Sequence, residues 1–302
     1  MMPLFRGLLT SLLLLACTVV CILPLILLGL IKALLPFPGG QHLLGVGVRF
    51  FARSWARINR RILLALLPTR WVIDGREHLH ADRSALVLCN HQSWVDIPCL
   101  VELMLDRAPF FTFFLKRQLI WVPFVGLACW ALDYPFMRRH SREAIARNPG
   151  LAHEDLATTR RACEKLRGRA VSLVNYVEGT RFTPAKQAAQ QSPYRHLLRP
   201  KAGGVAFTLN AMGDQISTVL DVTLFYPQGI PNFWQFLSGQ VQEVRMQVVA
   251  HEVPAEFRAG NYQQDASYRR AVQDWLNGLW QEKDQRIARW QSGTAEETKR
   301  AE

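Results

Sequence analysis

The chain has 302 residues, of which 49% are hydrophobic and 20% are charged, and its formal net charge is +12. Extended disorder is excluded because it requires low hydrophobicity, and a collagen-like chain is excluded because the 19 glycines and 16 prolines follow no period. The excess of basic residues predicts a polyanionic partner, which is nucleic acid, anionic lipid or a phosphorylated ligand.

An uncharged segment opens the chain. Residues 7–31 carry no charged side chain and lie between Arg6 and Lys32. As a helix these 25 residues would be about 37 Å long, enough to cross a hydrocarbon core of about 30 Å, and Pro24 is a place where the helix would kink. A cleaved signal peptide is the alternative, although its apolar region would be shorter and its start more basic. The heavier positive charge after the segment predicts that the rest of the chain lies on the cytoplasmic side, which corresponds to an inner (cytoplasmic) membrane location.

A second helix is predicted at residues 41–67, after a break rich in proline and glycine, and this helix is amphipathic. One of its faces is apolar, and another carries Arg49, Arg53, Arg57, Arg60 and Arg61. Such a helix is typical of an anionic membrane interface. The alternative is a helix packed on its own domain with its basic side in solvent. Residues 1–67 are therefore predicted to be membrane-anchoring helices, and residues 68–302 a separate domain that ends in a long helix.

Predicted strands and helices alternate along the second domain. This alternation is typical of an α/β fold with a mixed, largely parallel sheet flanked by helices. The polar segment 183–199 is predicted to be a loop. Strands are predicted at residues 71–74, 84–90, 109–115, 170–177, 216–226 and 241–249, and helices at 94–106, 154–167, 201–212 and 267–290.

The first chemically informative motif follows a predicted strand directly. In the run Asn90-His91-Gln92-Ser93-Trp94-Val95-Asp96, a histidine and an aspartate stand five residues apart across a turn into a helix. A carboxylate that meets an imidazole fixes its tautomer and stabilises the imidazolium, which makes a general base. The alternative is a surface histidine beside a helix-capping aspartate.

A second motif follows another predicted strand. Glycine permits close backbone approach there, and threonine and arginine donate hydrogen bonds to anions. Glutamate is a poor anion ligand but accepts from hydroxyl groups or orients the arginine. The alternative is an ordinary surface turn. The motif consists of Glu178, Gly179, Thr180 and Arg181.

Cations also occur in the apolar stretch between the two motifs. Lys116 precedes a run rich in aromatic and aliphatic residues, and Arg138 and Arg139 follow Phe136-Met137. A surface of this kind suits a ligand with a phosphate and an acyl chain. The alternative is ordinary core followed by a basic loop.

Taken together, the order of these motifs resembles the glycerolipid acyltransferase family, which includes 1-acylglycerol-3-phosphate and lysophospholipid acyltransferases. The resemblance covers about residues 71–249 and rests on the His-x4-Asp pair, the lysine block, Phe-x-Arg-Arg and Glu-Gly-Thr-Arg. It implies that His91 and Asp96 are catalytic. It also implies that the acceptor substrate is bound by Lys116, Arg138 or Arg139, and by Glu178, Gly179, Thr180 and Arg181.

Two positions depart from the family pattern. Gln118 stands where many relatives have glutamate, and the fourth block, usually similar to Val-Pro-Val, reads Leu220-Asp221-Val222-Thr223. The fourth block is closer to the lysocardiolipin-type branch. The resemblance as a whole implies 1-acylglycerol-3-phosphate as the acceptor, giving phosphatidate, and the fourth block makes a lysocardiolipin or lysophosphatidylglycerol type of acceptor the alternative.

The resemblance also predicts the other partners of the reaction. The donor is expected to be acyl-CoA or acyl carrier protein, and the acceptor to be a membrane lysophospholipid, with no nucleic acid involved. No cofactor and no metal are expected, because neither a CxxC pair nor another metal-ligand spacing occurs. A non-catalytic membrane protein that binds anionic lipid is the alternative from another class, and a thioester hydrolase with the same base is a third.

Overall fold

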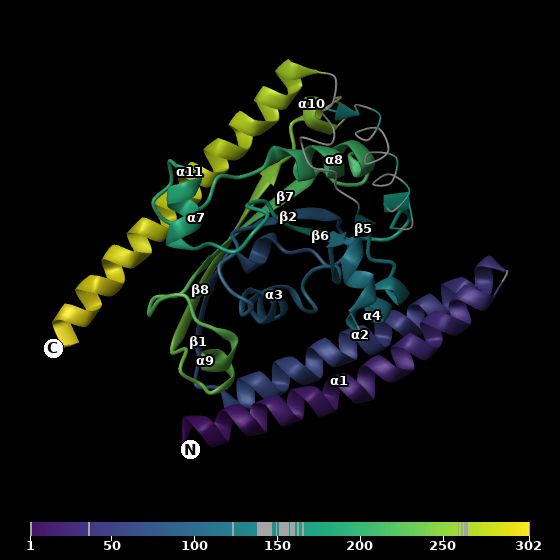
Figure 1. The fold of residues 1–302 in the computed structure, drawn as a ribbon, viewed down its shortest axis with the longest axis horizontal. Helices are drawn as coiled ribbons and strands as arrows, with labels where there is room; N and C mark the ends of the chain where they lie inside the picture. Colours follow the sequence, from purple (N-terminus) through teal and green to yellow (C-terminus); the bar gives the residue numbers. More distant parts are fainter. Residues whose placement is uncertain are drawn as a thin grey trace.

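The computed structural model describes residues 2–35, 37–122, 124–137, 147–148, 150, 157, 161, 163–164, 166–258, 260, 262 and 265–301 (Figure 1). Two long helices come first, α1 (Pro3–Leu34) and α2 (Pro38–Leu66). The strands are β1 (Arg70–Asp74), β2 (Ala85–Cys89), β3 (Phe111–Phe113), β4 (Leu115–Lys116), β5 (Phe136–Met137), β6 (Ser172–Tyr176), β7 (Thr218–Phe225) and β8 (Glu243–Glu252). The other helices are η1 (Arg76–His78), α3 (Asp96–Met104), η2 (Arg117–Trp121), α4 (Val125–Ala131), α7 (Pro184–Ala189), α8 (Ala202–Met212), α9 (Phe233–Leu237), α10 (Ala255–Arg258) and α11 (Ala266–Ala301).

The main sheet is mixed but largely parallel. Within the described ranges its strand order is β1-β8-β7-β2-β6-β3. Strands β7, β2, β6 and β3 run parallel, β8 runs antiparallel to β7, and β1 pairs parallel with β8. Strands β4 and β5 form a separate parallel pair. The predicted α/β fold is therefore confirmed, and the carboxyl ends of β2, β6 and β7 meet at one edge of the sheet, where such folds place their sites.

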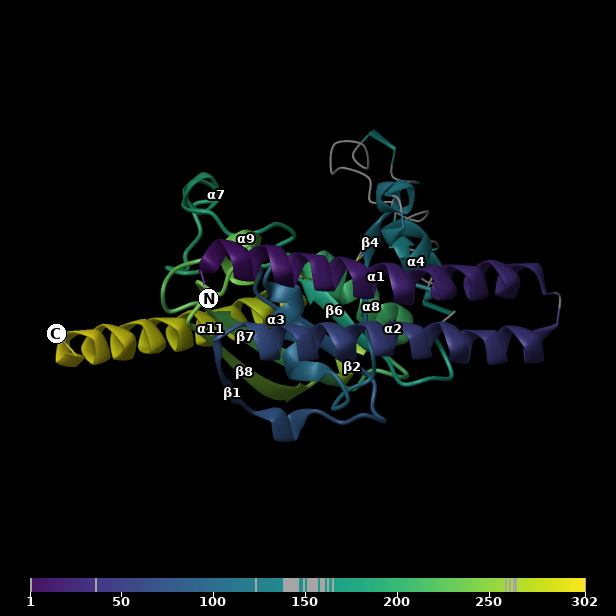
Figure 2. The ribbon, with the colours of Figure 1, turned by 90° about the horizontal axis from the view of Figure 1, so that it is seen from below.

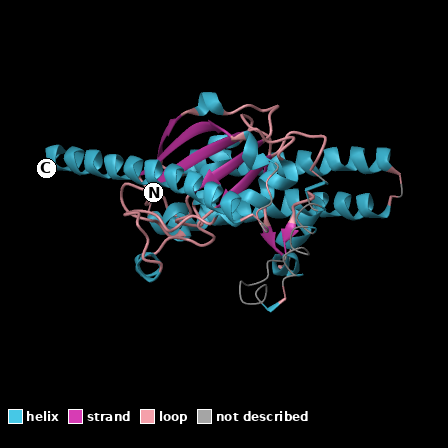
Figure 3. Cartoon of the chain, turned by 90° about the horizontal axis from the view of Figure 1, so that it is seen from above, coloured by secondary structure: helices cyan, strands magenta, loops and turns pink. Residues whose placement is uncertain are grey.

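Helices cover both faces of this sheet (Figures 1 and 3). Helix α3 lies on one face, while α8 and α11 lie on the other. The side chains of β2 alternate between two hydrophobic cores, because successive residues of a strand point to opposite faces. Val87 and Cys89 join the core that contains α3, and Leu86 and Leu88 join the core that contains α8 and α11. Every residue of β2 is buried, which is expected of a central strand in a parallel sheet.

Helices α1 and α2 lie side by side along the domain, next to the α3 side (Figure 2). Near one end of α1, Gly7 lies against Trp234 of α9 so closely that a Cβ would clash with the indole. Near the other end, Gly29 lies equally close to Ala131 of α4. Helix α1 therefore follows the domain over its length instead of extending away from it. The opposite face of α1 is apolar and exposed, and α1 is the described helix that is long and apolar enough to cross a membrane.

The arginines of α2 do not form one solvated row. Arg57 forms a two-pronged ion pair with Asp106, and Arg60 forms one with Glu102 of α3. This half of the helix is fastened to the domain, in agreement with the alternative interpretation. Arg49 is partly buried and has no such partner among the described residues.

The structure differs from the sequence expectations in two places. The predicted loop 183–199 contains helix α7, whose first turn is capped by the Thr183 hydroxyl accepting from the Lys186 amide at 3.2 Å. The predicted strand 109–115 is divided, because β3 joins the main sheet and β4 pairs with β5. Most of the predicted helix 154–167 lies outside the described residues.

Candidate active site

The site is built on the loop that leaves β2. Asn90, the first residue of this loop, is fully buried, and its side chain makes two hydrogen bonds with the backbone of Leu224 in the neighbouring strand β7. Nδ2 of Asn90 donates to the carbonyl oxygen of Leu224, and Oδ1 of Asn90 accepts from the backbone N–H of Leu224, both at 2.9 Å. Because both hydrogen bonds are buried, they fix the position of the first loop residue relative to strand β7.

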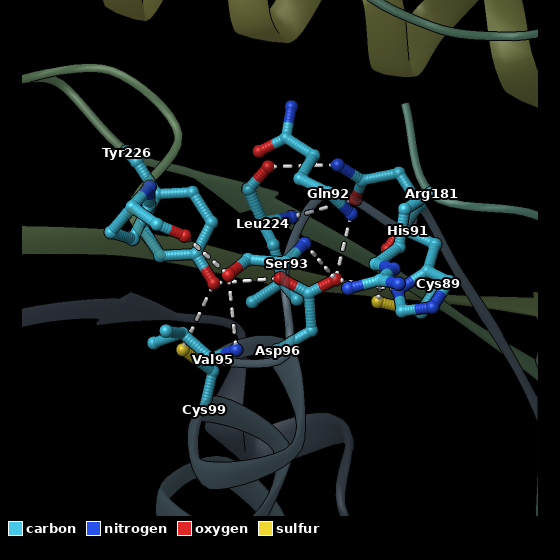
Figure 4. Close-up of polar contacts among 12 residues, drawn as sticks. Cys89, His91, Gln92, Ser93, Val95, Asp96, Cys99, Arg181, Leu224 and Tyr226 are labelled. Atoms are coloured by element: carbon cyan, nitrogen blue, oxygen red, sulfur yellow. Dashed lines mark hydrogen bonds and ion pairs between the residues drawn. The ribbon is translucent and has the colours of Figure 1, made fainter. Parts of the chain in front are cut away.

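His91 and Asp96 meet where this loop turns into α3 (Figure 4). Nδ1 of His91 lies 2.8 Å from Oδ2 of Asp96, whose side chain is fully buried while that of His91 is 19% exposed. Oδ2 of Asp96 also accepts hydrogen bonds from the backbone N–H groups of Gln92 (2.7 Å) and Ser93 (3.0 Å). Asp96 is the first residue of α3, where the helix dipole also favours a negative charge. The structure thus brings the two predicted residues together.

The second carboxylate oxygen of Asp96 has its own donor. The hydroxyl of Tyr226, the residue after β7, donates to Oδ1 at 2.7 Å, and Cys99 of α3 lies 3.6 Å from the same hydroxyl. Burial, followed by the nearby Cys99 and Asp96, raises the pKa of Tyr226 well above its ordinary value. Tyr226 is therefore a neutral donor throughout the physiological pH range.

These contacts assign the tautomer of His91. Its Nδ1 carries the proton that points to Asp96, so Nε2 keeps its lone pair. No described residue forms a hydrogen bond with Nε2. The imidazole stacks on the ring of Tyr176 at the end of β6, with 4.0 Å between centroids and 19° between planes. The ring is thus held from one side and along one edge, and its free nitrogen is available as a base.

The second motif lies beside the first. The amide of Phe182 donates to the carbonyl oxygen of His91 at 2.7 Å, which joins the two loops directly. The guanidinium of Arg181 lies 4.8 Å above the ring of Trp94, within cation–π range. Lys186 of α7 donates to the hydroxyl of Thr180 at 2.8 Å and to the carbonyl oxygen of Arg181 at 3.0 Å. Arg181 and Lys186 therefore give this side of the site a positive charge.

Glu178 occupies a different position from the rest of its motif. Its side chain is fully buried, and burial raises the pKa of its carboxyl to about 8. The amides of His91 and Leu198, the charge of Lys283 and the indole of Trp280 oppose this rise, although neither carboxylate oxygen has a partner in good hydrogen-bonding geometry. At neutral pH Glu178 is therefore largely protonated, behind the loop that carries His91.

The fourth block of the sequence contacts the C-terminal helix α11. Asp221 of β7 is fully buried and forms ion pairs with Lys283 (2.7 Å) and Arg286 (3.2 Å) of α11. Arg286 also donates to the hydroxyl of Thr223. Lys283 donates to the carbonyl oxygen of Val222 as well. The residues that depart from Val-Pro-Val therefore provide acceptors for two buried cations of α11.

The other predicted substrate residues have different outcomes. Gly179 adopts a φ of +71°, which favours glycine, and the Lys201 ammonium lies close to it. Lys116 lies in β4. Arg138 and Arg139 lie outside the described residues, so their contact with substrate stays a prediction.

Several site residues were not predicted. Tyr226 and Tyr176 follow or end strands that neighbour β2, so the rule that parallel strands end at one edge would have found both. Lys186 was not predicted as a site residue because its segment, 183–199, was interpreted as a polar loop. Among the described residues, no group of three histidines, cysteines or acidic residues could hold a metal ion.

A histidine held by a buried carboxylate at the carboxyl edge of a largely parallel sheet defines a general-base site of an α/β enzyme. The chain belongs to the Acyltransferase family, whose sequence profile matches residues 70–226. It is 26% identical to 1-acyl-sn-glycerol-3-phosphate acyltransferase 3 of Arabidopsis thaliana over 242 residues, which is 68% of this chain and 60% of that protein. The predicted family membership is thus confirmed.

Two further relatives show how far the similarity extends. Lysocardiolipin acyltransferase 1 of Danio rerio is 24% identical over 253 residues, 78% of this chain and 60% of that protein. The chain therefore spans about 60% of the length of the curated relatives that it matches. The crystal structure of PlsC, the 1-acyl-sn-glycerophosphate acyltransferase of Thermotoga maritima, matches with a TM-score of 0.52 and 18% identity, covering 93% of this chain and 98% of that one. This last match shows a shared fold.

Proposed function

We propose that the protein transfers a fatty acyl chain from an acyl thioester to the free hydroxyl of a lysophospholipid, with 1-acylglycerol-3-phosphate as the acceptor and phosphatidate as the product. The observation that carries this proposal is the arrangement of His91, whose Nδ1 lies 2.8 Å from Asp96 while no described residue bonds to Nε2. A hydroxyl acceptor needs a base of this kind, and the names of the relatives indicate the same class of acceptor.

The proposed reaction has two steps. Nε2 of His91 takes the proton of the acceptor hydroxyl while the oxygen attacks the thioester carbon, and Asp96 stabilises the imidazolium that forms. The tetrahedral intermediate then collapses, the carbon–sulfur bond breaks, and the thiolate receives the proton from His91. The products are an ester and a free thiol. No acyl-enzyme is needed, because both substrates are held together at the same base.

The proposed acceptor is favoured by the charge beside His91. Arg181 and Lys186 are cations on the same side of the site, and the side-chain hydroxyl of Thr180 lies beside them. A phosphate monoester is dianionic near neutral pH and pairs well with guanidinium and ammonium groups. A lysocardiolipin type of acceptor is the second candidate, because relatives named for that activity also match this chain.

The membrane location is part of the proposal. The outer face of α1 is apolar and exposed over most of its length, and α1 is bound to the domain near both ends. We propose that this face enters the inner (cytoplasmic) membrane from its cytoplasmic side, so that the acceptor reaches His91 without leaving the lipid. The donor, acyl-CoA or acyl carrier protein, then arrives from the cytoplasm, and no cofactor or metal takes part.

The experiment follows thiol release from acyl-CoA and acyl carrier protein by membranes that contain the protein, with and without 1-acylglycerol-3-phosphate, and identifies the lipid product. We expect acceptor-dependent thiol release, formation of phosphatidate and no loss with EDTA. His91→Ala should lower turnover by about 10²–10⁴-fold, while His80→Ala, an exposed histidine, should leave it unchanged. Acceptor-independent release would indicate a hydrolase, and a fully active His91→Ala protein would refute the mechanism.

A further inference from the structure

Three adjoining cavities lie at the opposite edge of the sheet from His91. One of them is lined by Ser84, Ala170 and Thr218, which stand at the amino ends of β2, β6 and β7, and the smallest also touches Ala170. The cavity next to α1 and α2 has a volume of about 500 Å³ and the smallest about 260 Å³. Arg169 lines all three cavities, and Arg49 of α2 lines two of them. Neither His91 nor Asp96 lines any of them.

The cavity beside α1 and α2 has uncompensated positive charge. Of its cations, Lys32 makes an ion pair with both oxygens of Asp133 at 2.7 and 2.9 Å, and Arg167 pairs with Asp214 at 2.9 Å. The guanidinium groups of Arg49 and Arg169 make no hydrogen bond or ion pair with any described residue, although the carbonyl oxygen of Arg169 accepts from the side chain of Gln215. Burial, followed by the nearby charge of Arg169, lowers the pKa of Arg49, and only Asp133, already paired, opposes this. Two guanidinium groups are thus held near each other at a cost in stability.

The neighbouring residues of α2 show that this arrangement is specific. Further along the helix, Arg57 and Arg60 each meet a carboxylate of the domain. Among the described residues, no carboxylate forms an ion pair with Arg49, and the nearby Asp133 is paired with Lys32. Gly45, one helical turn before Arg49, has no side chain to fill this space. A Cβ at this position would lie 3.1 Å from a guanidinium nitrogen of Arg49. The guanidinium therefore lies close to the helix at Gly45, and both residues line the cavity.

The walls of the cavity suggest the chemistry of its occupant. Planar guanidinium groups bind phosphate oxygens in pairs. Trp130 and Ala33 add apolar surface beside the arginines. The two helices that form one wall also expose large apolar side chains near the cavity, namely Leu34, Leu43, Val46 and Phe50. A ligand that combines a phosphate with acyl chains satisfies both features.

We propose that this cavity binds the phosphate group of an anionic membrane phospholipid through Arg49 and Arg169, at a site separate from the acceptor site at His91. The lipid would be retained rather than converted, because the pair that acts in the proposed reaction, His91 and Asp96, does not line this cavity. Such a site would hold the α1–α2 end of the domain against an anionic membrane. The inference does not depend on the proposed reaction, because acylation of a detergent-dispersed acceptor does not require this cavity.

The test compares Arg49→Gln and Arg169→Gln with the control Arg61→Gln, which removes one charge from an exposed position of α2 outside the cavities. Binding to vesicles of phosphatidylcholine with and without phosphatidylglycerol is measured by flotation at low and high salt. At high salt the control should bind as the wild type does, because an exposed charge is screened. Each cavity variant should bind about fivefold more weakly to the anionic vesicles and equally to the neutral ones.

Thermal unfolding in detergent separates a binding role from a structural one. Without lipid, Arg49→Gln should unfold at a higher temperature than the wild type, since repulsion and burial of charge are relieved. Phosphatidylglycerol in mixed micelles should then raise the Tm of the wild type more than that of either variant. Lower Tm values with unchanged vesicle binding would show that the arginines are structural and overturn the proposal. Protection by inorganic phosphate but not by phosphatidylglycerol would overturn the assignment to lipid.

Discussion

The hydroxyl of Tyr226 donates a 2.7 Å hydrogen bond to Oδ1 of Asp96, although 130 residues separate the two in the chain. Together with the amides of Gln92 and Ser93 and with Nδ1 of His91, it surrounds the carboxylate with donors. The aspartate therefore has one orientation, and through Oδ2 it gives the imidazole one orientation as well.

The first prediction concerns this contact. Tyr226→Phe removes the donor and leaves a buried carboxylate oxygen without a partner, at a cost of about 1–3 kcal/mol. Because Tyr226 is buried and contacts Asp96, we expect it to act through the carboxylate, so that kcat falls about tenfold or more with little change in the KM of either substrate. Steady-state kinetics on both substrates measure this. A large rise in KM with constant kcat would contradict a positioning role.

The second prediction concerns Arg181. If it pairs with the acceptor phosphate, Arg181→Ala should lower kcat/KM for 1-acylglycerol-3-phosphate by about 10- to 100-fold and leave the donor KM unchanged. Arg181→Lys keeps the charge but loses the paired geometry and should fall in between. A change confined to the donor KM would show that Arg181 binds the phosphates of the donor instead.

The third prediction concerns the pH dependence of stability. Burial raises the pKa of Glu178 from 4.5 to about 8. Between these two pH values, the folded protein therefore holds one proton that the unfolded chain has already lost. Its contribution to stability is full below about pH 4.5 and is lost as the pH rises to about 8, by at most about 1.4 kcal/mol per pH unit.

Glu178→Gln removes this titration. The difference in stability between variant and wild type should therefore grow in favour of the variant from pH 5 to pH 8. Chemical denaturation of both proteins in detergent across this range measures the difference. A difference that does not change with pH would mean that Glu178 is ionised in the folded protein.

The fourth prediction concerns the buried ion pairs of α11. Lys283→Met leaves Asp221 with Arg286 alone and should destabilise the protein by about 3–5 kcal/mol. Adding Asp221→Asn removes the uncompensated charge and should restore part of the loss. Denaturation of the two single variants and the double variant gives the coupling between the residues. Additive effects would show that the pair is not coupled.

The fold and the contact between His91 and Asp96 could be predicted from the sequence because both depend on local patterns. Alternating apolar strands and periodic helices specify the layers, and the step from β2 through His91 to Asp96 takes only a few residues. The long helix α1 was also clear, since its apolar segment has no charge.

The remaining features depend on residues far apart in the chain. The end of β7 beside β2 places Tyr226 at the edge of the sheet that carries the site, but nothing near it in the sequence shows that its hydroxyl reaches Asp96. Likewise, nothing near Lys283 shows that it pairs with Asp221. The arginines of α2 had the same periodicity whether they faced lipid or the domain, and only the positions of Asp106 and Glu102 separated those that pair from Arg49. Long-range pairing of this kind leaves no trace in a single sequence.

The close packing of Gly7 and Gly29 has a consequence for how the protein searches for substrate. Because α1 packs closely against the domain near both ends, these contacts fix the position of His91 relative to α1. If α1 enters a bilayer as proposed above, encounters with a lipid acceptor become collisions in two dimensions. The rate should then follow the mole fraction of acceptor in the leaflet, and diluting the same amount of acceptor with inert lipid should slow the reaction.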